Sequence, residues 1–235
     1  MSPTSRTPLQ PDVGVLLPAA GKGERMGGEP KQFRLIAGVP MLLRAIRPFA
    51  QHPSVRQIVV ALPPAVAADP PEWLALVTGD RLKLVTGGAS RAASVRAALD
   101  ELDPECRTVL VHDAARPFVT PETIDAVIRT AKETGAVPAV PVSDTLKQVD
   151  AGSARIVGTT DRTSLWRAQT PQGFPRDMLE AGFQVAEARG YENFTDESSM
   201  VEAAGFAVRV VHDSAWNLKI TTESDLALAE LMAVR

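Results

Sequence analysis

Short apolar runs alternate along the chain with longer stretches in which apolar residues recur at helical spacing. The apolar runs are rich in Val, Ile and Leu, which is typical of strands buried on both faces of a sheet. The expected strands cover residues 13–17, 57–62, 82–85, 108–111, 136–142 and 207–211, and the expected helices cover residues 41–50, 91–102, 121–134, 176–189 and 223–232. This alternation predicts an α/β fold with a parallel sheet covered by helices.

Turn and cap signals refine these elements. Thr120 is a suitable N-cap with Pro121 at the first helical position, and Gly135 stands where a C-cap glycine is expected. Four prolines within residues 62–73 predict a surface connection with at most one short helical piece. Residues 143–163 predict a β-hairpin. Because an isolated hairpin is marginal in water, we expect it to lean on the domain body or on a second copy of the chain.

The composition indicates one globular domain. With 45% apolar and 23% charged residues, the chain does not resemble a disordered protein, a collagen-like fibre or a coiled coil. We expect a loose tail over residues 1–11 and a single domain over residues 12–235. The longest apolar stretch, residues 13–20, is too short to span a bilayer, and the tail lacks the apolar core of a secretory signal. The lone Cys106 needs no oxidising compartment, so a cytoplasmic location is expected.

The charge balance limits the possible partners. Lys and Arg number 25 against 28 Asp and Glu, so the net charge is −3, which argues against nucleic-acid and membrane-surface binding. An anionic ligand therefore requires a local basic site. The three histidines lack metal-ligand spacing, so no zinc site is expected.

The strongest chemical signal is the segment PAAGKGERM, residues 18–26, which directly follows the first expected strand. Small residues there let backbone N–H groups approach a polyphosphate, and Lys22, Arg25 and the nearby Lys31 supply positive charge. The spacing matches neither the P-loop nor the Rossmann dinucleotide pattern. A nucleotide site is the functional interpretation, and a flexible glycine-rich turn with solvated charges is the alternative.

A second signal is HDAARP, residues 112–117, at the end of an apolar strand. Ligands of open α/β sheets bind at the carboxyl ends of strands, where Asp113 could hold a metal ion or a ribose hydroxyl and Arg116 a phosphate. A structural Asp–Arg pair is the alternative. His112 is expected to orient the loop rather than to perform acid–base chemistry.

Four further candidates are less specific. The segment GGASR, residues 87–91, with Ser94 could bind a base or a phosphate, or could be only a capped helix start. Arg162 at the end of the hairpin could be simply solvated. Thr195 could cap a helix or receive a phosphate. Lys219 alternates with apolar residues, a position that favours a lysine paired with an anion.

The order of these motifs resembles one family over nearly the whole chain, the 2-C-methyl-D-erythritol 4-phosphate cytidylyltransferases of the non-mevalonate isoprenoid pathway. The matching elements are PAAGxGxRM from Pro18, PKQ from Pro30, Gly87-Gly88 with Arg91 and Ser94, HDAARP, Asp144-Thr145, Asp161-Arg162, Thr195-Asp196-Glu197 and NLKIT from Asn217. The resemblance implies a Rossmann-like nucleotidyltransferase fold, with helices on both faces of a mostly parallel twisted sheet. It also implies a homodimer whose β-hairpin arm, about residues 143–163, reaches into the partner.

The resemblance assigns three groups of site residues. The group that would bind CTP comprises Ala19, Ala20, Gly21, Gly23, Gly87, Gly88, Ser94, Asp113 and Lys219. The catalytic residues would be Arg25 and Lys31, which would flank the α-phosphate. The group for methylerythritol phosphate comprises Asp113, Arg116, Thr145, Arg162, Thr195 and Lys219, with Arg162 delivered by the other subunit.

The expected reaction is in-line attack of the methylerythritol phosphate on the α-phosphorus of CTP, with Mg²⁺ held mainly by CTP phosphates rather than by protein ligands. A phosphate nucleophile is already ionised at neutral pH, so no general base is expected. Two other functions remain open at this point. One is a ribitol 5-phosphate cytidylyltransferase, and the other is a non-catalytic nucleotide-sensing module.

Overall fold

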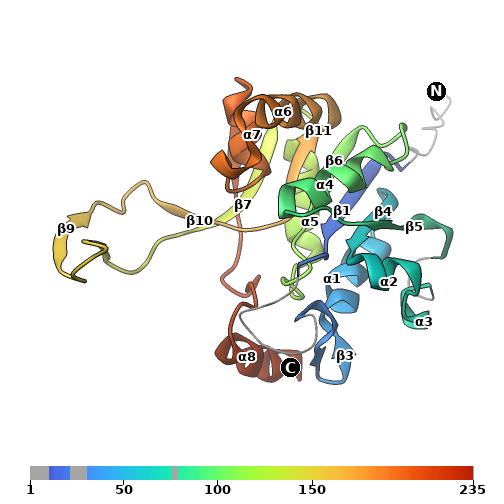
Figure 1. The fold of residues 1–235 in the computed structure, drawn as a ribbon, viewed down its shortest axis with the longest axis horizontal. Helices are drawn as coiled ribbons and strands as arrows, with labels where there is room; N and C mark the ends of the chain where they lie inside the picture. The colour runs from blue at the N-terminus through green and yellow to red at the C-terminus, as the bar shows by residue number, and fades with distance from the viewer. Residues whose placement is uncertain (1–10, 22–30, 76–78, 235) are drawn as a thin grey trace, which may run out of the picture.

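The computed structural model describes residues 11–21, 31–75 and 79–234, so the expected N-terminal tail lies outside the described residues except for Pro11. A central sheet of eight strands forms the middle layer (Figure 1). Its order is β10 (Trp166–Ala168), β7 (Gly135–Pro141), β11 (Gln172–Pro175), β6 (Thr108–Val111), β1 (Val13–Pro18), β4 (Val55–Leu62) and β5 (Leu82–Thr86), with β12 (Val208–His212) also paired with β7. The mostly parallel α/β sheet predicted from the sequence is confirmed.

All six expected strands are present, with end points within two residues of the predictions. The strands β1, β4, β5 and β6 run parallel to one another. The sequence pattern did not show β10 and β11, which are three and four residues long and run antiparallel to their neighbours. Both are too short to produce a recognisable alternation of apolar and polar residues.

Helices cover both faces of the sheet. The apolar side chains of α1 (Met41–Ala50) and α5 (Pro121–Ala131) pack on one face, and those of α4 (Arg91–Asp100), α6 (Arg176–Arg189) and α7 (Glu197–Ala203) pack on the other. The two faces of the sheet carry separate apolar cores. In strand β1, Val13, Val15 and Leu17 belong to the core on one face and Leu16 to the core on the other, because successive side chains of a strand alternate across the sheet.

The remaining elements are short or peripheral. They are α2 (Pro64–Ala68), α3 (Glu72–Ala75), α8 (Glu223–Ala233), the hairpin of β2 (Leu35–Ile36) and β3 (Val39–Pro40), and the 3-10 turns Lys31–Phe33, Gly79–Arg81 and Tyr191–Asn193. A third apolar cluster joins α8 to the segment that follows β6. The proline-rich connection thus holds two short helices rather than one at most, because Pro64 occupies a first helical position, which proline tolerates.

Two of the cap predictions fail. Thr120 does cap α5 by accepting a hydrogen bond from the Thr123 N–H. Gly135, however, is not its C-cap: the C-cap of α5 is Lys132, and Gly135 begins β7, where a Cβ would collide with Val208. Thr195 does not cap α7 either, because Asp196 does, forming a capping box with Ser199.

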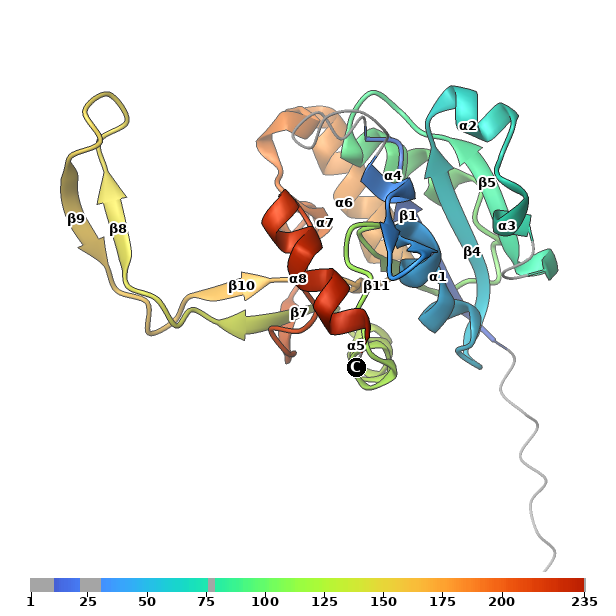
Figure 2. The same cartoon turned by 90° about the horizontal axis from the view of Figure 1, so that it is seen from below.

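The predicted β-hairpin arm is confirmed. Strands β8 (Leu146–Val149) and β9 (Ile156–Thr160) pair only with each other and stand well away from the body of the chain (Figure 2). Apolar side chains on both strands are exposed, among them Val149, Ile156 and Val157. No other part of the chain that the structure describes covers this apolar surface.

No helix among the described residues combines the length and the apolar character that crossing a bilayer requires.

Candidate functional site

A cavity of about 890 Å³ opens at the carboxyl ends of the parallel strands. Its lining comes from the segments that follow β1, β4, β5 and β6, and from a loop near the C-terminus: Pro18, Ala19, Ala20, Gly21, Lys31, Gln32, Pro63, Pro64, Gly87, Gly88, Ala89, Ser90, Arg91, Ser94, Asp113, Ala114, Ala115, Lys219 and Thr221. This is the edge at which open α/β sheets bind ligands. The structure therefore brings most of the predicted site residues together.

Four of the predicted site residues lie either outside the described residues or on the arm. Gly23 and the catalytic candidate Arg25 lie outside the described residues, as does Lys22. Thr145 and Arg162 lie on the arm, are exposed, and are not among the residues that line the cavity. The Arg162 guanidinium donates to the carbonyl of Ser143 at the base of the arm.

The glycines of the cavity wall allow two loops to touch. The Gly87 N–H donates to the Leu62 carbonyl at 2.8 Å, and a Cβ on Gly87 would lie 2.2 Å from the Ala20 Cβ. At Gly88 an added Cβ would lie 2.5 Å from the Ala93 Cβ. Only residues without a side chain fit at these two positions, so the loop after β5 can form a wall of exposed backbone against the loop after β1.

The start of α4 is held by its own cap. Ser90 is the N-cap and accepts from the Ala93 N–H at 3.1 Å, so the helix-cap alternative holds for this segment. The buried Ser94 hydroxyl donates to the Ser90 carbonyl at 2.9 Å while its residue lines the cavity. Capping and cavity lining thus occur together in one segment.

The central charged group is the Asp113 carboxylate, at the end of β6. Its Oδ1 atom is 3.0 Å from Nε of Arg91 and its Oδ2 atom is 2.8 Å from Nζ of Lys219, while Nε of Arg116 lies 3.9 Å away. Burial alone raises the pKa of this carboxyl, but Arg91 and Lys219 outweigh burial and hold the pKa well below its usual value. Asp113 is therefore a carboxylate at all physiological pH values.

Arg116 lies behind Asp113 and is itself buried. Its Nη1 atom donates to the Asn217 carbonyl at 2.7 Å and its Nη2 atom lies 3.4 Å from the Ala168 carbonyl. The guanidinium thereby joins the end of β10 to the loop that carries Lys219. In this arrangement its terminal nitrogens face backbone carbonyls rather than the cavity.

His112 occupies the supporting position that the sequence predicts. The ring is fully buried, with Nε2 3.0 Å from the Arg116 carbonyl and Nδ1 3.0 Å from the Thr170 hydroxyl. Burial lowers the pKa of His112 to about 4, so the imidazole is neutral and holds the loop after β6.

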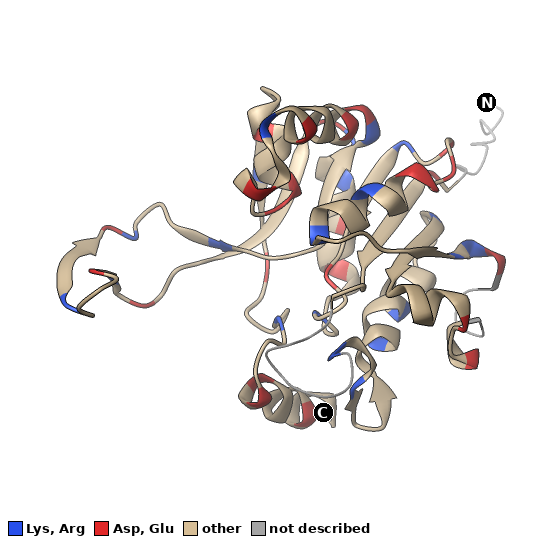
Figure 3. Ribbon diagram, in the orientation of Figure 1, with Lys and Arg blue, Asp and Glu red and all other residues tan. Residues whose placement is uncertain are grey.

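Two amines enter the cavity from separate parts of the chain. The side chain of Lys219 is 41% exposed and pairs with Asp113, which agrees with the interpretation of a lysine that meets an anion. Nζ of Lys31 donates to the Ile220 carbonyl at 2.5 Å, and the Ile220 N–H donates to the Ala115 carbonyl at 2.9 Å. The loop after β6 thus supports the position of both amines. On α4 and α6 basic residues are interspersed with acidic ones, whereas α1 carries only basic and α8 only acidic residues (Figure 3).

Sequence reasoning missed two members of the charged group. The sequence motif includes Arg91 but assigns it no role of its own. In the structure its Nη1 atom lies 2.6 Å from Oε1 of Glu197, and its Nε contacts Asp113. Glu197 is fully buried at the first position of α7. The sequence gives no sign of this burial, because glutamates at the start of a helix are usually exposed and stabilise the helix dipole.

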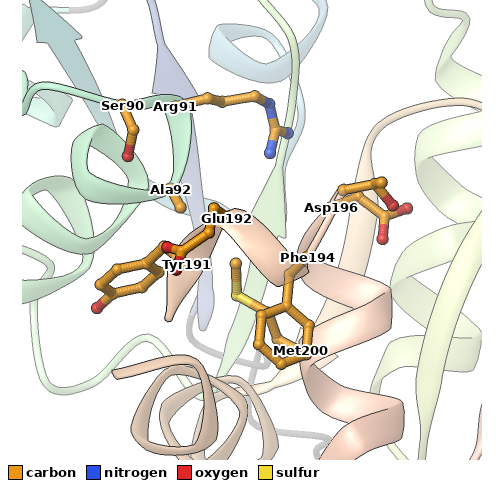
Figure 4. A pocket seen from close by; sticks show the side chains of 9 residues that line it. Ser90, Arg91, Ala92, Tyr191, Glu192, Phe194, Asp196 and Met200 are labelled. Atoms are coloured by element: carbon orange, nitrogen blue, oxygen red, sulfur yellow. The ribbon is translucent and has the colours of Figure 1, made fainter. Parts of the chain in front are cut away.

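A second, smaller cavity of about 400 Å³ lies beside the first (Figure 4). Its lining is Ser90, Arg91, Ala92, Tyr191, Glu192, Phe194, Thr195, Asp196 and Met200. The predicted substrate residue Thr195 lies here, not in the larger cavity. Figure 4 shows Arg91 extending from the start of α4 across the edge of this cavity, so Arg91 borders both spaces.

Comparison with known proteins identifies the family. Residues 13–235 match the family model of 2-C-methyl-D-erythritol 4-phosphate cytidylyltransferase (IspD). A protein of that name from Solibacter usitatus is 44% identical over 93% of this chain and 94% of its own length, and one from Symbiobacterium thermophilum is 44% identical over 95% and 94%. A bifunctional IspD/IspF enzyme of Rhodopseudomonas palustris is 44% identical, with 55% of its length covered.

Solved structures agree. The crystal structure of 2-C-methyl-D-erythritol 4-phosphate cytidylyltransferase from Thermus thermophilus matches with a TM-score of 0.79 at 36% identity, covering 95% of this chain and all of that one. The Francisella tularensis structure of the same name matches with a TM-score of 0.80 at 32% identity, covering 94% and 99%. The resemblance drawn from the motifs is confirmed, and the chain belongs to the family of 2-C-methyl-D-erythritol 4-phosphate cytidylyltransferases.

Proposed function

We propose that the 890 Å³ cavity is where this chain transfers CMP from CTP to 2-C-methyl-D-erythritol 4-phosphate, giving 4-diphosphocytidyl-2-C-methyl-D-erythritol and pyrophosphate for isoprenoid precursor synthesis. One observation carries the proposal. In a chain of net charge −3, Lys31, Lys219 and Arg91 converge on a cavity walled by glycine-rich loops. Such a wall of N–H groups and cations suits two phosphorylated reactants whose charges repel each other.

The reaction requires one bond exchange. An oxygen of the methylerythritol phosphate attacks the α-phosphorus of CTP, and the bond from that phosphorus to the β-phosphate oxygen breaks as pyrophosphate leaves. Lys31 and Arg25 offset the negative charge on the transferring phosphoryl group, and no residue is needed to remove a proton from the ionised nucleophile. Neutral, fully bonded His112 agrees with that arrangement.

The two substrates occupy different parts of the site in this proposal. CTP lies against the loops after β1 and β5, which hold Ala19, Ala20, Gly21, Gly23, Gly87, Gly88 and Ser94. Asp113 and Lys219 lie between the reactants and contact both, with Arg116 adding positive charge from behind and Thr195 approaching from the smaller cavity.

The arm completes the site across a homodimer. Thr145 and Arg162 are exposed and do not line the cavity of their own chain, and apolar side chains of β8 and β9 are exposed as well. A second copy would cover these side chains and would receive Arg162 beside its methylerythritol phosphate.

The buried, unpaired Cys106 is compatible with the cytoplasm as the place of action.

Mg²⁺ is the expected cofactor. No three acidic, histidine or cysteine side chains lie together as metal ligands in the part of the chain that the structure describes, and both oxygens of Asp113 already face cations. These residues fit an ion that enters on CTP and takes phosphate oxygens and water as ligands. When bound, the ion supplies positive charge to the triphosphate. The Lys31 amine can then interact with the transferring phosphoryl group.

The test is pyrophosphate release with each of the four nucleoside triphosphates, against 2-C-methyl-D-erythritol 4-phosphate and ribitol 5-phosphate in turn. We expect release with CTP and methylerythritol phosphate. Release only with ribitol phosphate would assign the chain to that acceptor, and no release with any pair would favour a nucleotide sensor.

Replacing Gly87 tests the CTP wall. The new methyl group of Gly87→Ala would overlap the Ala20 Cβ, so the two loops must separate. We expect the KM for CTP to rise on the order of tenfold with a smaller change in kcat, because positioning of the nucleotide suffers first. The control is Gly152→Ala in the turn of the arm, where the nearest atom to an added Cβ is 3.7 Å away. An unchanged KM for CTP would contradict this placement of the nucleotide.

Replacing Arg162 tests the contribution of the arm. We expect Arg162→Ala to raise the KM for methylerythritol phosphate about tenfold or more while the KM for CTP changes little, because only the acceptor loses a charged partner. Steady-state kinetics with each substrate varied in turn measures this split. Arg129→Ala, at an exposed position of α5, is the control. The reverse split would place Arg162 on the nucleotide.

A further inference from the structure

The buried carboxylate of Glu197 has no place in the chemistry described so far. It is 0% exposed, and its Oε2 atom has no hydrogen-bond partner among the described residues. Isolated burial of a carboxylate is strongly unfavourable, so a charged group at this position requires a compensating interaction. Among the described residues, its charged partner is Arg91, whose Nη1 atom lies 2.6 Å from Oε1.

Arg91 links Glu197 to the reaction cavity. Its guanidinium reaches from the first turn of α4 to Glu197 on α7 by one nitrogen and to Asp113 at the end of β6 by another. Asp113 in turn meets Lys219. Charges therefore alternate along a row that starts in the core and ends at the cavity: Glu197, Arg91, Asp113 and Lys219.

We propose that Glu197 is a positioning residue for the nucleotidyl transfer: by binding Arg91 from behind, it fixes the guanidinium so that Asp113 presents its carboxylate to the acceptor and to Lys219. The inference rests on the function proposed above. Without the charge of Glu197, Asp113 is the one anionic partner that Arg91 keeps among the described residues, and Arg91 borders two open cavities. It is then free to swing toward substrate phosphate, and Asp113 loses its fixed orientation.

The electrostatics are consistent with this assignment. Burial raises the pKa of Glu197, and the nearby Asp113 charge adds to that effect, while Arg91 opposes both. Burial alone would lower the pKa of Arg91, yet Glu197 and Asp113 hold it above its usual value. Arg91 is therefore the group that keeps two neighbouring carboxylates compatible, and Glu197 is one of the two anions that hold Arg91 in place.

The test uses Glu197→Gln, which preserves the size and one carbonyl oxygen but removes the charge. We expect kcat/KM for methylerythritol phosphate to fall about tenfold, mostly through KM, with a smaller rise in the KM for CTP, because Asp113 contacts both substrates in the proposed arrangement. A purely structural role would lower the active fraction, and hence kcat, with both KM values unchanged. Glu202→Gln, an exposed glutamate on the same helix, is the matched control and should behave as the unmodified protein.

A double variant shows whether Glu197 acts through Arg91. Arg91→Met combined with Glu197→Gln removes both charges of a pair whose carboxylate is fully buried, and proteins often tolerate the removal of both charges together. We expect this double variant to have the same kcat/KM as Arg91→Met alone, because Glu197 then has nothing left to position. Losses that multiply, or equal rises in both KM values for Glu197→Gln, would overturn the proposal.

A crystal structure of Glu197→Gln supplies a readout that does not depend on activity. We expect the Arg91 guanidinium to leave Asp113, with Nε no longer at hydrogen-bond distance from Oδ1. An Arg91 that remains in place would overturn the proposal even if the activity were lost. If the unmodified protein failed to release pyrophosphate from CTP and methylerythritol phosphate, the proposed function would fall, and this structural result would still decide whether Glu197 holds Arg91.

Discussion

In Lys31→Ala we expect kcat to fall about 10²-fold or more, with a smaller change in the KM for CTP. The amine lies at the cavity and is held against the Ile220 carbonyl, beside Lys219. Under the proposed mechanism it meets negative charge that grows only as the phosphoryl group transfers, and losing such an interaction lowers the rate of the chemical step more than the binding of substrate. Single-turnover measurement of CMP transfer separates the two effects.

The control for this result is Lys132→Ala, which removes an exposed lysine at the end of α5. Circular dichroism should show that both variants keep the native fold. The Ile220 carbonyl loses one hydrogen bond in Lys31→Ala, a cost of about 1 kcal/mol that does not unfold a domain of this size. Near-normal turnover by a folded Lys31→Ala protein would remove Lys31 from the catalytic residues.

The second large effect is expected for Asp113→Asn. The substitution leaves Arg91, Lys219 and Arg116 without their shared counter-charge at a site where the carboxylate side chain is only 10% exposed. Breaking a buried pair from one side costs on the order of 3–5 kcal/mol, so we expect a loss of that size in the free energy of unfolding at pH 7. We also expect kcat/KM for methylerythritol phosphate to fall about 10²-fold or more.

The stabilising effect of Asp113 should depend on pH in a definite direction. Because the pKa of Asp113 is lower in the folded protein than its usual value of 3.8, its stabilising effect is complete above that value and is lost as the pH falls toward the folded-state pKa. The free energy of unfolding, measured with urea, should therefore differ by a constant amount between the wild type and Asp113→Asn from pH 7 to about pH 5. The difference should become smaller in stronger acid. The exposed Asp69→Asn is the control. Equal stability of wild type and Asp113→Asn at pH 7 would contradict the role of Asp113 as counter-charge.

The sequence could predict the parts of the molecule that depend on local pattern. Strands such as β1 and β6 are nearly continuous apolar runs because both faces are covered, and the glycines after β1 and β5 stand out because a close approach of backbones excludes side chains there. Four separate motifs meet at one edge of the sheet because parallel strands all end there.

What the sequence could not predict depends on contacts between distant segments. The burial of Glu197 follows from the packing of α7 beside α4, and the buried position of Arg116 follows from carbonyls at Ala168 and Asn217, far along the chain. The N-cap of α7 is Asp196 rather than Thr195. Both residue types are suitable N-caps, so the sequence alone does not distinguish these two neighbouring positions.

The position of β11 has a consequence for how the two substrate sites can change. This antiparallel strand lies between β6 and β7 and so separates the parallel strands whose loops form the CTP wall from β7 and β10, the strands that lead into and out of the arm. Under the proposed roles, Asp113 and Lys219 serve both substrates, whereas Thr145 and Arg162 on the arm serve the acceptor alone. Substitutions on the arm can therefore alter the preference for one sugar phosphate over another while the loops that hold CTP are inherited intact.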